Sequence, residues 1–325
     1  MKKKASEEHD DPDLGAEYDF KLSPRGKDAS RFRESAVDRT EMMMGKVHSW
    51  APLIDFPWAG SEKQMTVDTW VRGRGAYTGY AASEFRSYLS QEERRQCRDA
   101  EHWLQIDLPI HSGLSSPAAI NSFLVVLWIV APTRTRVPCR FEETKVERTV
   151  ARRLDRFQWI EGQALDDIHD KHLQETARLL PPLRDVYTTG RRLRNALILT
   201  YQGCVSKQWQ VAFTCFAAAA EAILSRSTDH GLSRRLAEDY ALLASTDGAD
   251  RKVARERFLR LYGIRSVIVH GRAHGRQEAD INLKDLAQFS DLLRGLWRIV
   301  LEKPDVRAAF EGDDEQRRLL FKALA

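Results

Sequence analysis

Apolar residues in the second half of the chain recur at intervals of three and four, which is the period of an amphipathic α-helix. Because short connections separate the periodic segments, the pattern predicts an antiparallel helical bundle. In the fourth segment the predicted inward stripe includes Tyr262, Ile268 and Val269, and the fifth ends before Pro304. The five predicted helices cover residues 193–204, 209–224, 232–243, 252–270 and 283–300.

The first half of the chain has shorter apolar runs, which favour strands. Residues 101–108 partly alternate, residues 123–130 are a continuous β-branched and aromatic run, and residues 136–141 predict a third strand. Pro138 places that third strand at an edge of the sheet. The pair Pro181-Pro182 is expected to end the segment before the bundle. The predicted fold class is an α+β N-terminal domain followed by an all-α antiparallel helical bundle.

Three parts of the 325-residue chain follow from these patterns. Residues 1–45 have few apolar positions and are interpreted as a flexible tail. Residues 46–180 form the α+β domain, with a sensing or positioning role, and residues 181–325 form the helical domain. The longest apolar run, 122–130, is shorter than the roughly 20 residues that a membrane span needs.

Cysteine usage and the N-terminus point to one compartment. The four cysteines show no paired or metal-ligand spacing, which is typical of the reducing cytosol. The N-terminal lysines are followed by charged residues, without the apolar segment of a secretory signal. We therefore expect a cytoplasmic protein with no membrane partner.

Positive charge is concentrated in one segment of the chain. The net charge of the whole protein is +4, but residues 251–276 alone carry +7 and the rest of the chain carries −3. Within the segment Glu256 is the one acid. Such a localised basic stripe is typical of a protein that binds a phosphate-bearing partner. A solvated helix face is the alternative interpretation.

Arg265 and His270 lie within that basic segment and are followed by Gly271. On a helix five residues correspond to about 500°, so the two side chains start about 140° apart. Gly271 fits a helix C-cap, where the helix dipole favours a protonated imidazole. A histidine that transfers protons beside a guanidinium that stabilises phosphate charge can cleave RNA without a metal. The alternative is a surface arginine beside a capping histidine.

Several blocks of the C-terminal half resemble, in order, the HEPN superfamily (higher eukaryotes and prokaryotes nucleotide-binding domain), most closely its Apea-like branch. The resemblance spans about residues 188–310. Its most specific part is residues 261–271, LYGIRSVIVHG, which resemble the hallmark "lY..RS.ivHG". The other matching blocks are RLRNAL at 192–197, FAAAAEAIL at 216–224, SRRLAEDYALL at 233–243, and the amphipathic segment 283–301.

The resemblance implies a HEPN-like bundle that commonly dimerises, with Arg-x4-6-His motifs of two protomers facing one groove. It also implies metal-independent cleavage of RNA that leaves 2′,3′-cyclic phosphate ends. Arg265 would then bind and stabilise the phosphate and His270 would transfer the proton. Glu221 would orient one of these two, with Tyr262 and Ser266 in supporting roles. The residues expected to contact RNA are Arg257, Arg260, Arg272, His274 and Arg276.

Three functions remain open at this point. The first is a metal-independent endoribonuclease of the HEPN type, acting as a stress or phage-defence effector. The second is a non-catalytic module that binds RNA or a nucleotide, and the third is a dimerisation or scaffolding domain. His169 and His172 stand at a spacing that a metal can use, but an exposed polar helix explains them more simply. We therefore expect RNA and a second copy of the chain as partners, and neither a metal nor a cofactor.

Overall fold

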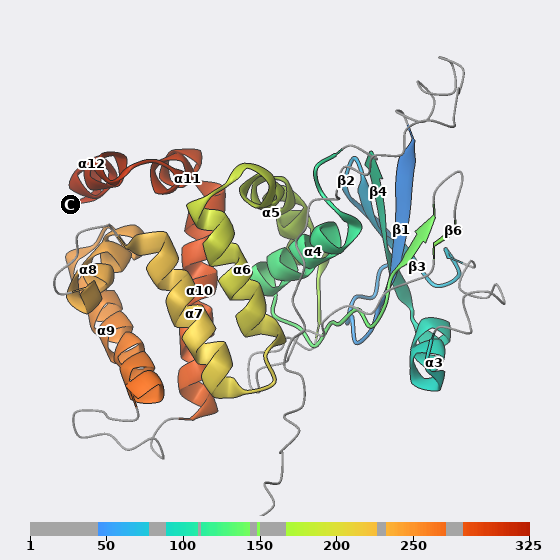
Figure 1. Ribbon diagram of the computed structural model, residues 1–325, viewed down its shortest axis with the longest axis horizontal. Helices are drawn as coiled ribbons and strands as arrows, with labels where there is room; N and C mark the ends of the chain where they lie inside the picture. Colours follow the sequence, from blue (N-terminus) through green and yellow to red (C-terminus); the bar gives the residue numbers. More distant parts are fainter. Residues whose placement is uncertain are drawn as a thin grey trace, which may run out of the picture. The chain divides into compact units, whose positions relative to one another are not determined.

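The computed structural model describes residues 45–77, 89–109, 112–143, 148–149, 167–225, 232–270 and 282–325. An antiparallel sheet with helices comes first and an all-helical region follows, which confirms the predicted fold class (Figure 1). These described residues all belong to one compact unit. Residues 1–44 of the predicted flexible tail lie outside the described residues. None of the described helices is long and apolar enough to cross a membrane.

The sheet is antiparallel, with six strands among the described residues in the order β2-β3-β4-β1-β5-β6. Its longest pairing joins β1 to β4, from Lys46 opposite Pro109 to Leu53 opposite His102. Helix α3 (Gln91–Asp99) precedes β4 and begins at a capping box formed by Ser90 and Glu93. The strands are β1 (Lys46–Leu53), β2 (Glu62–Thr66), β3 (Thr69–Gly73), β4 (His102–Pro109), β5 (Phe141–Glu143) and β6 (Arg148–Thr149).

One of the three predicted strands is confirmed. Residues 101–108 correspond to β4. Residues 136–141 are not a continuous strand, because Arg136 forms an isolated bridge with Ile54 and β5 begins only at Phe141. The intervening Pro138 has no backbone N–H with which to continue a ladder.

The prediction of a strand at 123–130 is wrong, because this run belongs to helix α4 (Ser116–Val130). The side chain of Ser115 accepts the N–H of Ala118 and caps the helix, and a proline occupies its first turn. Helix α4 contacts β1 and β4 on one side and helices α5 (Asp170–Thr189) and α10 (Leu283–Glu302) on the other (Figure 1). A helix enclosed on both sides is apolar around its circumference and shows no helical period in the sequence.

The prediction that Pro181-Pro182 ends a segment is also wrong, because α5 continues through both prolines to Thr189. Each proline removes one helical hydrogen bond, so other contacts must hold the helix. Leu180 and Leu183, on either side of the pair, are fully buried. Packing of this apolar face therefore overrides the local preference of proline.

Five helices lie where periodicity predicts them, and two more, α11 and α12, follow before the C-terminus. Helices α6 and α7 form a tight hairpin, in which a Cβ at Gly203 would stand 2.3 Å from the ring of Phe216. Val269 is half exposed, so its predicted inward position is wrong. The helices are α6 (Arg192–Val205), α7 (Trp209–Leu224), α8 (Leu232–Ala244), α9 (Gly248–His270), α10 (Leu283–Glu302), α11 (Pro304–Glu311) and α12 (Asp314–Leu324).

One apolar core extends from the sheet into the helices, from Ala51 of β1 to Phe321 of α12. A polar contact also joins the two regions. Arg184 of α5 donates to Asp68 at 2.7 Å and to Thr69 at 2.8 Å, at the β2–β3 turn. Burial acts to raise the pKa of Asp68, but hydrogen bonds from Thr66, Arg184 and Thr69 and the charge of Arg184 keep that pKa below its usual value.

Candidate functional site

Glu221, Tyr262 and Arg265 meet where the last turn of α7 lies against α9. The hydroxyl of Tyr262 donates to Oε2 of Glu221 at 2.9 Å, and Nη2 of Arg265 lies 3.5 Å from the same oxygen. Arg265 follows Tyr262 by three positions along α9, so the two lie on the same face of the helix. The guanidinium stands 5.8 Å from the ring centroid of Tyr262, within cation–π range. The structure therefore brings three of the predicted site residues together.

Burial sets the electrostatics of this cluster. The pKa of Tyr262 is raised above its usual value, first by burial and then by the charge and hydrogen bond of Glu221, while the charge of Arg265 acts in the opposite direction. Tyr262 is therefore a hydrogen-bond donor throughout the physiological pH range. The side chain of Arg265 remains 33% exposed, and its buried Nε has no partner among the described residues.

Two other arginines fix the end of α7 that carries Glu221. Arg192 donates through Nε to the carbonyl oxygen of Ala222 at 2.8 Å and also contacts the carbonyl of Ser225. Arg317 donates to the Ser225 carbonyl at 2.9 Å. The last carbonyls of a helix lack helical partners and carry partial negative charge, so these cations stabilise the terminus. Glu221 therefore stands on a well-anchored turn.

The basic stripe predicted along α9 is partly neutralised by acids and carbonyls of other helices. Arg260 donates to Oδ1 of Asp285 at 2.8 Å, and its Nη2 contacts the side chain of Gln288. Arg257 lies 3.4 Å from the backbone carbonyl of Gln288. Arg257 and Arg260, which were both predicted to contact RNA, therefore face α10. Sequence reasoning missed Asp285, although Asn282 and Asp285 form a capping box whose spacing is visible in the chain.

The remaining predicted site residues lie at or beyond the end of α9. The helix continues without a break from Arg265 to His270, so no unwinding brings these positions together before residue 270. Ser266 is exposed beside Arg265. The side chain of His270 and the whole of Arg272, His274 and Arg276 lie outside the described residues.

The predicted histidine pair lies at the start of α5. His169 is the N-cap residue, and its backbone N–H donates to Nδ1 of His172 at 3.2 Å. Burial is the first cause that lowers the pKa of His172, followed by the charges of Lys171 and His169. Within the part of the chain that the structure describes, no group of three or more histidines, cysteines or acids is placed to hold a metal ion. These contacts give the pair a capping role.

Comparison of the chain with protein-family models, with curated proteins and with solved structures gives no match.

Proposed function

We propose that the helical region is a metal-independent endoribonuclease of the HEPN type, with Arg265 and His270 as its catalytic residues. The observation that carries the proposal is the cluster of Glu221, Tyr262 and Arg265. It holds a partly exposed guanidinium one and a half turns before His270. The resemblance of residues 261–271 to the HEPN hallmark supports the same assignment.

The reaction uses the two residues in separate roles. His270 removes the proton from a ribose 2′-hydroxyl, whose oxygen then attacks the adjacent phosphorus. The bond from phosphorus to the 5′-oxygen of the next nucleotide breaks, and that oxygen takes up a proton. The products are a 2′,3′-cyclic phosphate and a 5′-hydroxyl. Arg265 stabilises the charge that develops on the phosphate oxygens, and Glu221 with Tyr262 holds the guanidinium in position.

A second copy of the chain completes the proposed site, since two Arg-x4-His pairs facing one groove provide contacts for a longer stretch of RNA. The protein would act as a stress or phage-defence effector in the cytoplasm. A non-catalytic RNA-binding module with the same Arg265 surface is the alternative function.

The test is cleavage of end-labelled single-stranded RNA in the presence of EDTA, with the product ends identified by mass spectrometry. Arg265→Ala and His270→Ala are each expected to lower the rate of cleavage by about 10²-fold or more while leaving thermal unfolding unchanged. Matched controls are Arg318→Ala, which removes an arginine paired with Glu315 on α12, and His48→Ala, which removes a partly buried histidine of β1 that is paired with Asp107.

Three results would contradict the nuclease. The first is cleavage that EDTA abolishes, and the second is cleavage that persists in both site variants. The third is salt-dependent RNA binding without any product, which would favour the binding module.

A further inference from the structure

Two of the four cysteines meet between helix α3 and the segment that leads into β5. The sulfurs of Cys97 and Cys139 lie 3.5 Å apart, although the two residues stand 42 positions apart in the chain. Both residues are buried, with exposed fractions of 1% and 0%. The two thiols are in hydrogen-bond contact, and an approach of about 1.5 Å would bring the sulfurs to the length of a disulfide bond.

The other two cysteines lie in the helical region. Cys204 of α6 is buried, and Cys215 of α7 is partly exposed. Neither of them stands beside a second thiol within the described ranges. The described part of the chain therefore holds one close pair of thiols, and two separate thiols that serve as controls.

The thiol pair belongs to a small apolar cluster that is separate from the main core. Trp103 of β4 is in this small cluster, whereas Leu104 and Ile106 of the same strand are in the main core with α4. Successive side chains of a strand point to opposite faces of the sheet. The small cluster and α3 therefore lie on the face of the sheet away from α4 (Figure 1).

Helix α3 has few anchors to the rest of the protein. It is 9 residues long, and the residues buried within it are Glu93, Gln96 and Cys97. A helix of this length is not stable alone in water. Cys97 is the one buried apolar side chain within the helix, so local opening of α3 requires much less free energy than unfolding of the whole protein. Each opening gives small molecules in solution access to both thiols.

The two thiols are not equivalent. Hydrogen bonding with Cys97 is the first cause that raises the pKa of Cys139, followed by burial and by the charges of Cys97 and Glu93. Cys139 therefore keeps its proton at neutral pH. The thiolate is the reactive form of cysteine, so Cys97 is assigned the first attack on an oxidant.

We propose that Cys97 and Cys139 form a reversible disulfide when the protein meets hydrogen peroxide. The sulfur of Cys97 attacks one peroxide oxygen, the O–O bond breaks, and the hydroxide that leaves combines with the proton of that thiol. The sulfur of Cys139 then attacks the sulfenic acid on Cys97. The S–O bond breaks, and its hydroxide combines with the proton of Cys139. Two thiols and one peroxide give one disulfide and two waters, and a dithiol reverses the oxidation.

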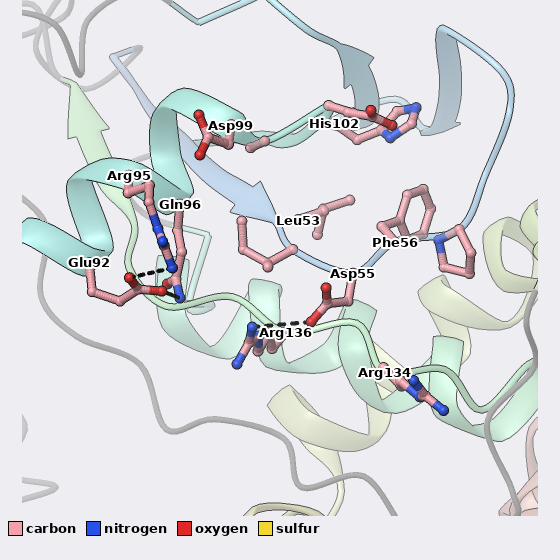
Figure 2. A pocket seen from close by; sticks show the side chains of 14 residues that line it. Leu53, Asp55, Phe56, Glu92, Arg95, Gln96, Asp99, His102, Arg134 and Arg136 are labelled. Atoms are coloured by element: carbon pink, nitrogen blue, oxygen red, sulfur yellow. Dashed lines mark hydrogen bonds and ion pairs between the residues drawn. The ribbon is translucent and has the colours of Figure 1, made fainter.

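The disulfide joins two walls of a pocket of about 680 Å³. In Figure 2, Gln96 comes from α3 and Arg136 from a separate segment, and the pocket extends to His102. Cys97 directly follows Gln96, and Cys139 follows Arg136 by three positions. Oxidation therefore fixes α3 to the segment that forms the other wall and suppresses the opening of the helix.

Peptide mapping of the full-length protein tests the proposal. Protein treated with millimolar hydrogen peroxide is denatured, alkylated with N-ethylmaleimide and digested with trypsin without a reductant. Trypsin cuts after arginine, so the expected product is peptide 96–98 linked by a disulfide to peptide 137–140. Two of the four thiols should escape alkylation, and dithiothreitol should restore both.

Thermal unfolding and variants give a second measurement. Because the disulfide restricts the unfolded chain, peroxide is expected to raise the midpoint of thermal unfolding by about 5 °C. Cys97→Ser and Cys139→Ser should each abolish this rise and the linked peptide. Cys204→Ala and Cys215→Ser are the matched controls and should retain both. The peptide mapping of the unmodified sequence remains decisive if a variant fails to fold.

Three results would overturn the proposal. All four thiols could remain free after peroxide treatment, or the disulfide that forms could join other cysteines or two copies of the chain. The third result is oxidation of Cys97 to a sulfinic acid without the linked peptide, which would mean that Cys139 does not reach the sulfenic acid. None of these measurements uses RNA, so their outcome is independent of the proposed nuclease.

Discussion

Arg260 and Arg265 lie five residues apart on α9, and the protein holds them in different ways. Arg260 forms a close ion pair with Asp285 at 2.8 Å and contacts Gln288 as well. Arg265 lies 3.5 Å from Glu221 and over the ring of Tyr262. The guanidinium of Arg260 connects α9 to the start of α10 through a close ion pair. The guanidinium of Arg265 makes a longer and weaker contact with its carboxylate.

This difference shows that a run of like charges in sequence need not act as one surface. A ligand phosphate that recruits Arg260 must break a close ion pair, and the carboxylate left behind would be largely buried. Recruiting Arg265 disturbs a longer contact whose carboxylate keeps the hydrogen bond from Tyr262. We therefore expect Arg260 to contribute mainly to stability and Arg265 mainly to function.

The largest expected effect concerns Arg265. On the proposed function, Arg265→Ala lowers the rate of RNA cleavage by about 10²–10³-fold, the range seen when one donor to a developing oxyanion is removed. Arg260→Ala should change the rate per folded molecule by no more than a few-fold. Single-turnover cleavage of labelled RNA measures both rates. Equal losses in the two variants would mean that the two arginines do not differ in role.

The next effect concerns the stability of the α9–α10 contact. Asp285→Ala removes the ion pair with Arg260 and the capping hydrogen bond to the backbone N–H of Asn282. We expect the free energy of unfolding to fall by about 1–3 kcal/mol, as for a lost cap and a lost charged hydrogen bond. Urea unfolding followed by circular dichroism measures it. Glu315→Ala is the control, and a loss of the same size in that variant would argue against a special role for Asp285.

A smaller effect is expected at Tyr262. Tyr262→Phe removes the donor to Glu221 and should lower the free energy of unfolding by about 0.5–1.5 kcal/mol at neutral pH. The pKa of Tyr262 in the folded protein is raised, so above about pH 10 the unfolded chain loses this proton while the folded protein keeps it. Wild-type stability must therefore fall as the pH rises above that value.

Urea unfolding of both proteins between neutral pH and pH 11 isolates the contribution of Tyr262. Tyr262→Phe should show the shallower decline, since it lacks the group that retains a proton. Parallel declines in the two proteins would mean that the raised pKa has no effect on stability.

The smallest effect concerns RNA binding by Arg257. A free phosphate contact would lower the slope of log K against log salt by about 1 when it is removed. Because Arg257 lies 3.4 Å from the carbonyl of Gln288, we expect Arg257→Gln to lower the slope by less than that. Filter binding at several salt concentrations measures the slope. A decrease of a full unit would mean that Arg257 contacts an RNA phosphate.

Local patterns predicted the helices that carry one apolar stripe, as α6 to α10 show. They failed where tertiary packing determines the secondary structure. Helix α4 is enclosed by the sheet and by other helices, so its sequence has no polar face, and only Ser115 with the following proline indicated a helix start. Helix α5 passes through two prolines because its buried leucines hold it.

The candidate site could be predicted only in part, because some of its contacts join different helices. The resemblance placed Glu221 near Arg265, and the structure brings the two together with Tyr262. The partnership of Arg260 with Asp285 crosses from one helix to another, so no spacing along the chain reveals it. The pocket at His102 was missed because its walls come from segments far apart in sequence.

The position of α4 has a consequence for how the protein can be divided. A chain cut near residue 180 would leave α4 with its helix-facing side in water and would strip α10 of a neighbour. Neither fragment is expected to fold alone, and the intact protein should melt in a single cooperative transition in calorimetry. The sheet region and the helical region would then share one folding equilibrium, and a ligand that binds the folded form of either region would stabilise both.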